Sequence, residues 1–235
     1  TLEGTREFTD MVDGEVFASV SQLYEFESFE LKFGADWRNK ARSGEIVVAE
    51  NAGGPLFPPA DPPDVGQAYD IEEKRMDPYV VVRGDGGFFK YEAGLRYETT
   101  KSEVTDRGDG AHTVSANDYA FLLPSAHALF NITEDDRIRA SVARTVRRPS
   151  FDQISPALLE EEPTEDNDLV GNPDLKPESA WGFDLGYEHR IGRRGVAGIN
   201  FFYRDVTNRI ELASTGVPSS GGGGFVLTPS NIGNG

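Results

Sequence analysis

The sequence predicts an all-β protein, an antiparallel up-and-down sheet of long strands that forms a segment of a transmembrane β-barrel. The alternating segments run to about ten residues or more, whereas strands in ordinary sheets average about five or six and a tilted spanning strand needs about 9–11. Short and long connections also alternate along the chain. Bacterial outer-membrane barrels have this order, with short periplasmic turns and long outer loops.

Alternation by itself leaves two interpretations open. In a soluble sheet the apolar face packs on a core and the polar face meets water. In a membrane barrel the apolar face meets lipid and the polar face lines a wet lumen. The order of the connections favours the barrel, because soluble sandwiches mix loop lengths less regularly.

The first half of the chain predicts four strands and no clear period over residues 1–14. The strands cover 15–24, 30–40, 71–83 and 88–101. Short turns are expected at 25–28 and at 84–87, where Gly-Asp-Gly-Gly tolerates the positive φ of a tight hairpin. Long loops are expected at 44–68, which contains Gly and Pro breakers, and at 102–116.

The second half predicts four more strands, at 119–130, 137–145, 181–190 and 196–210. Short turns are expected at 131–136 and 191–195. Long loops are expected at 148–177, which is strongly acidic, and at 214–224, which is rich in Gly and Ser. Residues from Phe225 onward are expected to begin a last strand, and no helical stretch is predicted.

Side chains that alternate along these strands predict two faces. The lipid-facing set comprises Trp37, Tyr91, Leu95, Tyr97, Trp181, Phe183, Leu185 and Tyr187. The lumen-facing set comprises Glu92, Arg96, Glu98, Arg139, Asp184 and Glu188. Several aromatics of the apolar face, with Tyr79 assigned to them, lie toward strand ends as an interfacial girdle requires.

Composition excludes several classes of function. The formal net charge of -17 argues against nucleic acid as a partner. The chain has no Cys, which excludes disulfides and thiolate metal sites. Its three His are isolated, and its Gly-rich stretches open no helix, so no catalytic or phosphate-binding pattern is present. We therefore expect a protein that is not an enzyme.

Motifs in the chain resemble the barrel of TonB-dependent outer-membrane receptors. They are Arg147-Arg148-Pro149-Ser150-Phe151, GNPDLKPE at 171–178, WGFDLGYE at 181–188, YEAGLRYET at 91–99, Leu123-Pro124-Ser125, and FFYRDV at 201–206 with Ile210. Each is weak alone, but they follow the family's order over roughly residues 28–235.

The resemblance implies a bacterial outer-membrane location and active transport without chemistry on the solute. It implies that residues 1–235 are part of a barrel of about 22 strands, with the plug domain and the first and last strands absent. The implied partners are outer-membrane lipid, the protein's own plug, TonB through that plug, and a small solute such as a carbohydrate or metal chelate. The alternative is a soluble or surface β domain that binds glycans. The two hypotheses differ in detergent dependence, because the soluble domain would fold cooperatively as a monomer in plain buffer.

The long acidic loop supplies the candidate ligand contacts. They are Arg148, Phe151, Asp152, Glu165, Asp166, Asp168 and Asn172. Its carboxylates favour a solvated, self-repelling loop. Ca²⁺ is the alternative, because it prefers clustered carboxylate and carbonyl oxygens, although no EF-hand spacing is present. No cofactor or other metal is expected.

Overall fold

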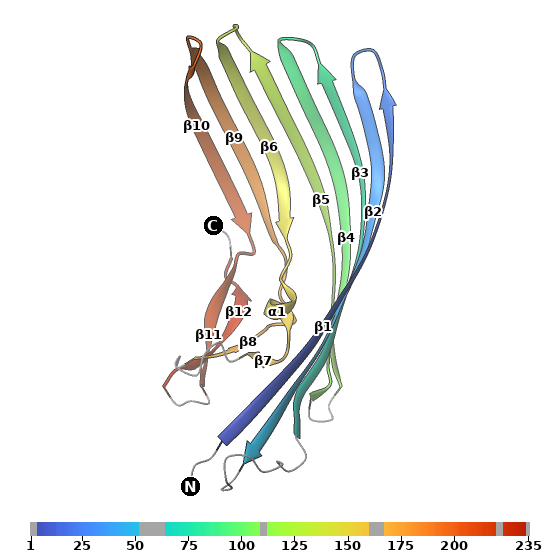
Figure 1. Ribbon diagram of the computed structural model, residues 1–235, viewed down its shortest axis with the longest axis vertical. Helices are drawn as coiled ribbons and strands as arrows, with labels where there is room; N and C mark the ends of the chain where they lie inside the picture. The colour runs from blue at the N-terminus through green and yellow to red at the C-terminus, as the bar shows by residue number, and fades with distance from the viewer. Residues whose placement is uncertain (1–3, 52–63, 109–111, 160–166, 220–222, 234–235) are drawn as a thin grey trace.

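The computed structural model describes residues 4–51, 64–108, 112–159, 167–219 and 223–233. Its main element is a curved, antiparallel sheet with the strand order β1-β2-β3-β4-β5-β6-β9-β10 (Figure 1). These strands are β1 (Gly4–Glu25), β2 (Glu30–Asn51), β3 (Asp64–Asp85), β4 (Phe89–Asp106), β5 (Thr113–Asn131), β6 (Asp136–Arg147), β9 (Glu178–Ile191) and β10 (Gly195–Thr207). We call this eight-stranded sheet the wall.

The four short turns of the wall lie together at one end, and the long connections lie at the other (Figure 1). The turns join β1 to β2, β3 to β4, β5 to β6 and β9 to β10. Each of these pairs is antiparallel. The predicted hairpin rhythm is therefore confirmed.

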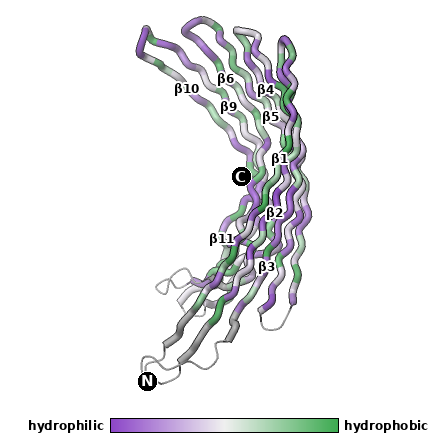
Figure 2. The backbone as a smooth tube through the Cα atoms, turned by 45° about the vertical axis from the view of Figure 1, so that its right-hand side comes forward, coloured by the Kyte–Doolittle hydropathy of each residue, from purple (hydrophilic) through white to green (hydrophobic). Residues whose placement is uncertain are grey.

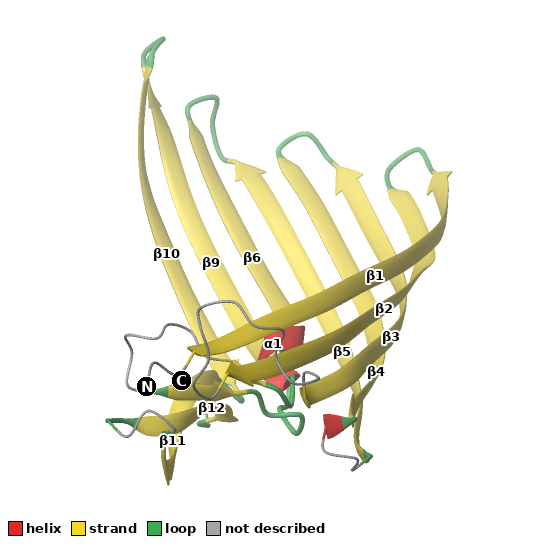
Figure 3. Ribbon diagram, turned by 60° about the horizontal axis from the view of Figure 1, so that its bottom comes forward, coloured by secondary structure: helices red, strands yellow, loops and turns green. Residues whose placement is uncertain are grey.

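The register gives the wall two different faces. Leu95 lies opposite Pro124 and Val80, while its neighbour Arg96 lies opposite Leu123 and Tyr79. Figure 2 shows hydrophobic and hydrophilic residues alternating along the strands. The β6–β9 connection packs on the concave face of the wall, inside its curve (Figure 3).

Several strands are longer than the sequence predicted. The expected loop at 44–68 is strand up to Asn51 and again from Asp64, and the expected loop at 102–116 is strand up to Asp106 and from Thr113. Residues 4–14, which show no period, belong to β1. Beyond the lipid these strands need no apolar face, because cross-strand hydrogen bonds alone continue the ladder.

A second, four-stranded sheet at the loop end was not predicted. Its strand order is β11-β12-β8-β7, made by β11 (Ile210–Pro218), β12 (Phe225–Asn231), β8 (Asp168–Val170) and β7 (Leu158–Leu159). The predicted strand 196–210 breaks at Asn208, where φ is 57°. The predicted last strand from Phe225 is confirmed as β12, which pairs with β11 and β8 and not with the wall.

A short helix, α1 (Phe151–Ile154), was also missed. It lies inside the curve of the wall (Figure 3). The buried core lies here: Tyr69, Ile71 and Val104 of the wall pack with Ile154 and Leu175. No helix among the described residues is long and apolar enough to cross a membrane.

Candidate functional site: an inward loop on the wall

Arg148 anchors the connection between β6 and β9 to the concave face. We call residues 148–159 and 167–177 of this connection the inward loop. The Arg148 guanidinium forms an ion pair with Glu98 and donates from Nε to Thr100 Oγ1 at 3.1 Å. The side chains of Arg148 and Glu98 are only 13% and 10% exposed. The loop is therefore fixed to β4 by a buried, charge-assisted contact.

The Arg148–Glu98 pair belongs to a larger charge network. Arg75 Nη2 lies 2.6 Å from Asp77 Oδ2 and 3.5 Å from Glu98 Oε2. Among the described residues, Arg75 Nε and Asp77 Oδ1 are buried without a hydrogen-bond partner. Because an unpaired buried polar group destabilises the fold, removing one member of this network leaves its partners unpaired and lowers the folding stability.

Arg42 provides a second anchor nearer the loop end. It donates from Nη1 to Asp152 Oδ1 at 2.5 Å and from Nε to Asp13 Oδ1 at 2.7 Å. Its guanidinium also lies over the Phe151 ring, 5.6 Å from the centroid. The hydrogen bond from Arg42 lowers the pKa of the Asp13 carboxyl.

Local capping shapes the loop where it enters the curve. Ser150 Oγ accepts from the Gln153 amide, and Gln153 Oε1 accepts from the Ser150 amide at 3.0 Å, so the two residues form a capping box. Ile154 and Ala157, which follow, are buried. The RRPSF segment thus turns the chain sharply from the wall into the interior.

The GNPDLKPE segment ties the returning half of the loop to its surroundings. Asn117 of β5 donates to the Pro173 carbonyl at 2.6 Å, and Asn172 donates to the Pro229 carbonyl at 3.0 Å. Asn231 accepts from the Lys176 amide and donates to the Lys176 carbonyl, each at 2.9 Å. The inward loop is therefore bonded both to the wall and to the four-stranded sheet β11-β12-β8-β7, which we call the outer sheet.

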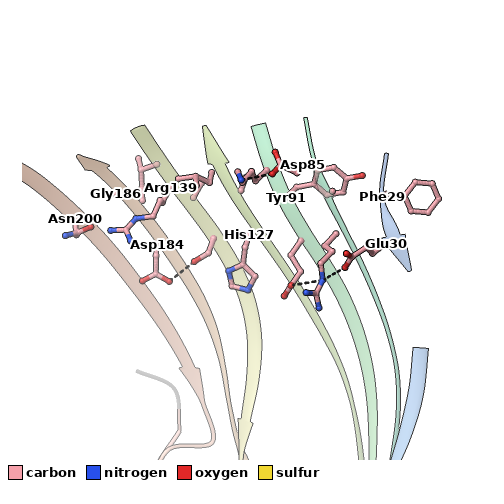
Figure 4. A pocket seen from close by; sticks show the side chains of 18 of the residues that line it. Phe29, Glu30, Asp85, Tyr91, His127, Arg139, Asp184, Gly186 and Asn200 are labelled. Atoms are coloured by element: carbon pink, nitrogen blue, oxygen red, sulfur yellow. Dashed lines mark hydrogen bonds and ion pairs between the residues drawn. The ribbon is translucent and has the colours of Figure 1, made fainter. Parts of the chain in front are cut away.

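Two hollows lie on the concave face. The smaller, of about 510 Å³, lies beside α1, and its charged lining is Lys40, Arg42, Arg75, Arg148, Asp13, Glu15, Glu73 and Asp152. The larger, of about 1020 Å³, lies near the short turns. Figure 4 shows Glu30, His127 and Asp184 among the side chains of neighbouring strands that line the larger hollow.

The structure places the six predicted lumen residues on the concave face, each with a partner. Arg96 pairs with Asp36 at 2.8 Å, and Asp184 pairs with Arg204 at 2.9 Å. The other contacts are Glu92 with Arg83 at 3.8 Å, Glu98 with Arg148, and both Arg137 and Arg139 with Glu188. Contact between these residues and a lumen remains a prediction.

The eight predicted lipid-facing residues share the convex face by register. Seven are 37–53% exposed: Trp37, Leu95, Tyr97, Trp181, Phe183, Leu185 and Tyr187. Tyr91 is half-buried, beside Gly84 and the Phe89 ring. The assignment of Tyr79 was wrong, because its register with Arg96 puts it on the concave face, where the Arg96 guanidinium lies 4.6 Å from its ring centroid.

The predicted ligand-loop residues divide into three groups. Arg148, Asn172 and Asp152 bond to other residues of the protein, whereas Asp168 is buried and Phe151 is half-buried against the Arg42 guanidinium. Glu165 and Asp166 lie outside the described residues. Ligand contact remains a prediction for all seven.

No group of three metal-ligating side chains gathers among the residues that the structure describes. Most of the acidic run, at 160–166, lies outside them. The calcium hypothesis therefore stays a prediction.

Sequence reasoning missed the anchor Arg42 and the charges Glu73, Arg75 and Asp77 of β3 near Arg148. A signal was present for the last three, because charges two residues apart in a strand share a face, as do 73, 75 and 77. The contact of Arg42 with Asp152, 110 residues later, could not be read from spacing.

Comparison with known proteins supplies the remaining evidence. The family described as "TonB dependent receptor-like, beta-barrel" matches residues 3–235. No curated protein sequence matches the chain. Three similar solved structures are the copper transporter OprC, the ferric-catecholate import receptor Fiu from K12 E. coli, and the ferric citrate transporter FecA in its unliganded form.

Each of the three is 14% identical to this chain, a level that indicates a shared fold alone. The TM-scores are 0.64, 0.60 and 0.59 in that order. The alignments cover 95%, 96% and 88% of this chain but 34%, 34% and 29% of the solved chains. The chain thus spans about a third of the length of these relatives.

The family comprises transport receptors of the bacterial outer membrane. An open, curved sheet with short turns at one end and long loops at the other is what a portion of such a barrel requires. With the family match over residues 3–235, these features show that the chain belongs to the β-barrel domain of the TonB-dependent receptors.

Proposed function

We propose that this chain forms part of the wall and the outer constriction of a receptor that takes up a scarce solute. The solute binds at the outer loops and passes through a plugged barrel, driven by energy delivered through TonB. The supporting observation is the inward loop, which Arg148 fixes across the concave face. A segment held there narrows the path that a solute must follow, so it can select what enters.

In this proposal the protein's own plug domain lies in front of the concave face. Charges on that face, including Arg139 and Arg204, offer polar contacts for it. TonB acts on the plug and does not contact the wall. The wall residues hold the plug and orient the solute, and no bond of the solute is made or broken.

The solute is a small polar molecule such as a carbohydrate or a metal chelate. The hollow of about 510 Å³ beside α1 has the size of a small-molecule site. Its lining carries four basic and four acidic side chains, so it favours a solute with both donors and acceptors over a strongly charged one.

Energy-dependent uptake tests the proposal. Cells that carry or lack the receptor are grown on a panel of oligosaccharides and metal chelates supplied at limiting concentration. We expect one class to require the receptor and its uptake to stop when TonB is deleted or the proton gradient is collapsed. Binding to the purified receptor should persist without TonB. Uptake that continues without TonB would indicate a passive channel and would overturn the proposal.

A further inference from the structure

The turn between β9 and β10 carries unpaired positive charge in an acidic protein. Arg193 and Arg194, which we call the basic turn, are both exposed, while the chain as a whole has a net charge of -17. Neither forms an ion pair with a carboxylate of the described residues, whereas nearby Arg137 and Arg139 both pair with Glu188. These cations are available for an external anion.

The other three short turns have the opposite character. The β1–β2 turn is flanked by Glu25, Glu27 and Glu30, and the β5–β6 turn carries Glu134, Asp135 and Asp136. At the β3–β4 turn, Lys90 is neutralised by Asp85 at 2.6 Å. Of the four short turns, the β9–β10 turn is therefore the one whose cations lack a carboxylate partner among the described residues.

The basic turn lies where the apolar convex surface ends. Tyr187, Ile191 and Ile199 are exposed on the β9–β10 hairpin near this turn. The Tyr187 hydroxyl donates to Asp136 Oδ1 at 2.6 Å, and His189 Nδ1 lies 2.8 Å from the same oxygen. This polar cluster marks the edge of the lipid-facing band, because interfacial Tyr residues lie at headgroup level.

We propose that the basic turn binds the phosphate of an anionic phospholipid. Guanidinium groups match phosphate oxygens in geometry and charge. Exposed Ile191 and Ile199 offer an apolar surface for the acyl chains of the same lipid. Short turns face the periplasm in these barrels, so the lipid belongs to the periplasmic leaflet. The inference does not depend on which solute is transported.

The test measures lipid binding to the complete receptor by native mass spectrometry and by titration in nanodiscs. The probes are phosphatidylglycerol and, as the neutral comparison, phosphatidylcholine. We expect R193Q/R194Q to bind phosphatidylglycerol about 25-fold more weakly at low salt, since each Lys or Arg near an anionic surface contributes roughly fivefold. Raising the salt should weaken the parent and leave the double variant unchanged.

The matched control is K101Q/R107Q, which removes two exposed cations at the opposite end of the wall. These side chains pair with Asp118 and Asp70, so this variant should keep the parental lipid affinity. Heat-dependent mobility on gels confirms that each variant is folded. Equal affinity of the two double variants would overturn the proposal. So would a photo-crosslinker at Arg193 that captures an acidic protein segment in place of lipid.

Discussion

Replacement of Arg148 by Met should loosen the inward loop. The substitution keeps an apolar stem but leaves Glu98 buried with only Arg75, whose Nη2 is 3.5 Å away. Removing one partner of a buried ion pair costs about 3–5 kcal/mol. Because Arg75 offers partial compensation, we expect the lower end of that range, about 3 kcal/mol.

Hydrogen exchange in the complete receptor measures this loss locally. The amides of Gln153, Ile154 and Asn172 donate to backbone oxygens within the inward loop. If they exchange by local opening, a loss of about 3 kcal/mol accelerates them roughly 100-fold. Amides in the centre of the wall should keep their parental rates.

The neighbouring arginine gives a matched control. Arg147 pairs with Glu178 at 3.3 Å, but its side chain is 66% exposed. Surface ion pairs contribute about 0–1 kcal/mol, so R147M should accelerate the same amides no more than about fivefold. Similar effects of R147M and R148M would refute the claim that Arg148 is the anchor.

A double variant distinguishes two causes of the loss in R148M: the missing attraction between Arg148 and Glu98, and the buried Glu98 charge left without its partner. E98Q/R148M removes both members of the pair and leaves Arg75 with Asp77, which are 2.6 Å apart. We expect exchange rates within about tenfold of the parent, because replacing both partners costs less than removing one. No recovery in the double variant would show that packing, and not charge, holds the loop.

Three further predictions follow from the wall and its turns. F201R on the convex face should cost about 2–4 kcal/mol of folding stability in lipid, whereas F202R, opposite Asp184 on the concave face, should cost little; equal losses in urea titrations would contradict the face assignment. Hydrogen bonds from Thr133, Tyr187 and His189 lower the pKa of Asp136 to about 2. The ionised Asp136 carboxylate therefore contributes its full stabilisation of the fold above the ordinary carboxyl pKa, and that stabilisation is lost as the pH falls through about 2. The NMR chemical shift of the Asp136 carboxyl carbon should report this titration. G34A should impair folding, since a Cβ there would lie 2.4 Å from the Val20 carbonyl oxygen; a normal heat-dependent gel shift would count against it.

Much of the wall was predictable because its physics is local. Alternation fixed which residues share a face, and Gly-rich or Asp-rich turns fixed where the chain reverses. Tyr79 was misplaced because an aromatic residue was assumed to follow the apolar face, although its position in β3 puts it in register with Arg96. Alternation and residue type thus disagreed, and alternation was the better guide.

The inward loop was not predictable for the opposite reason. Arg148 and Glu98 are 50 residues apart, and nothing in their spacing indicates that a loop folds back over the concave face. The four-stranded outer sheet is similar, since β8 has only three residues and its partner β12 lies far along the chain. Such short strands carry no periodic signal.

The outer sheet has a consequence for engineering. Parallel pairing of Val226 with Asp168, together with the bonds from Asn172 and Asn231, joins two connections that are separated by the whole β9–β10 hairpin. The two connections are therefore bonded to each other, so transplanting either one alone into a related receptor would break these bonds. A chimera that exchanges specificity must therefore move both together.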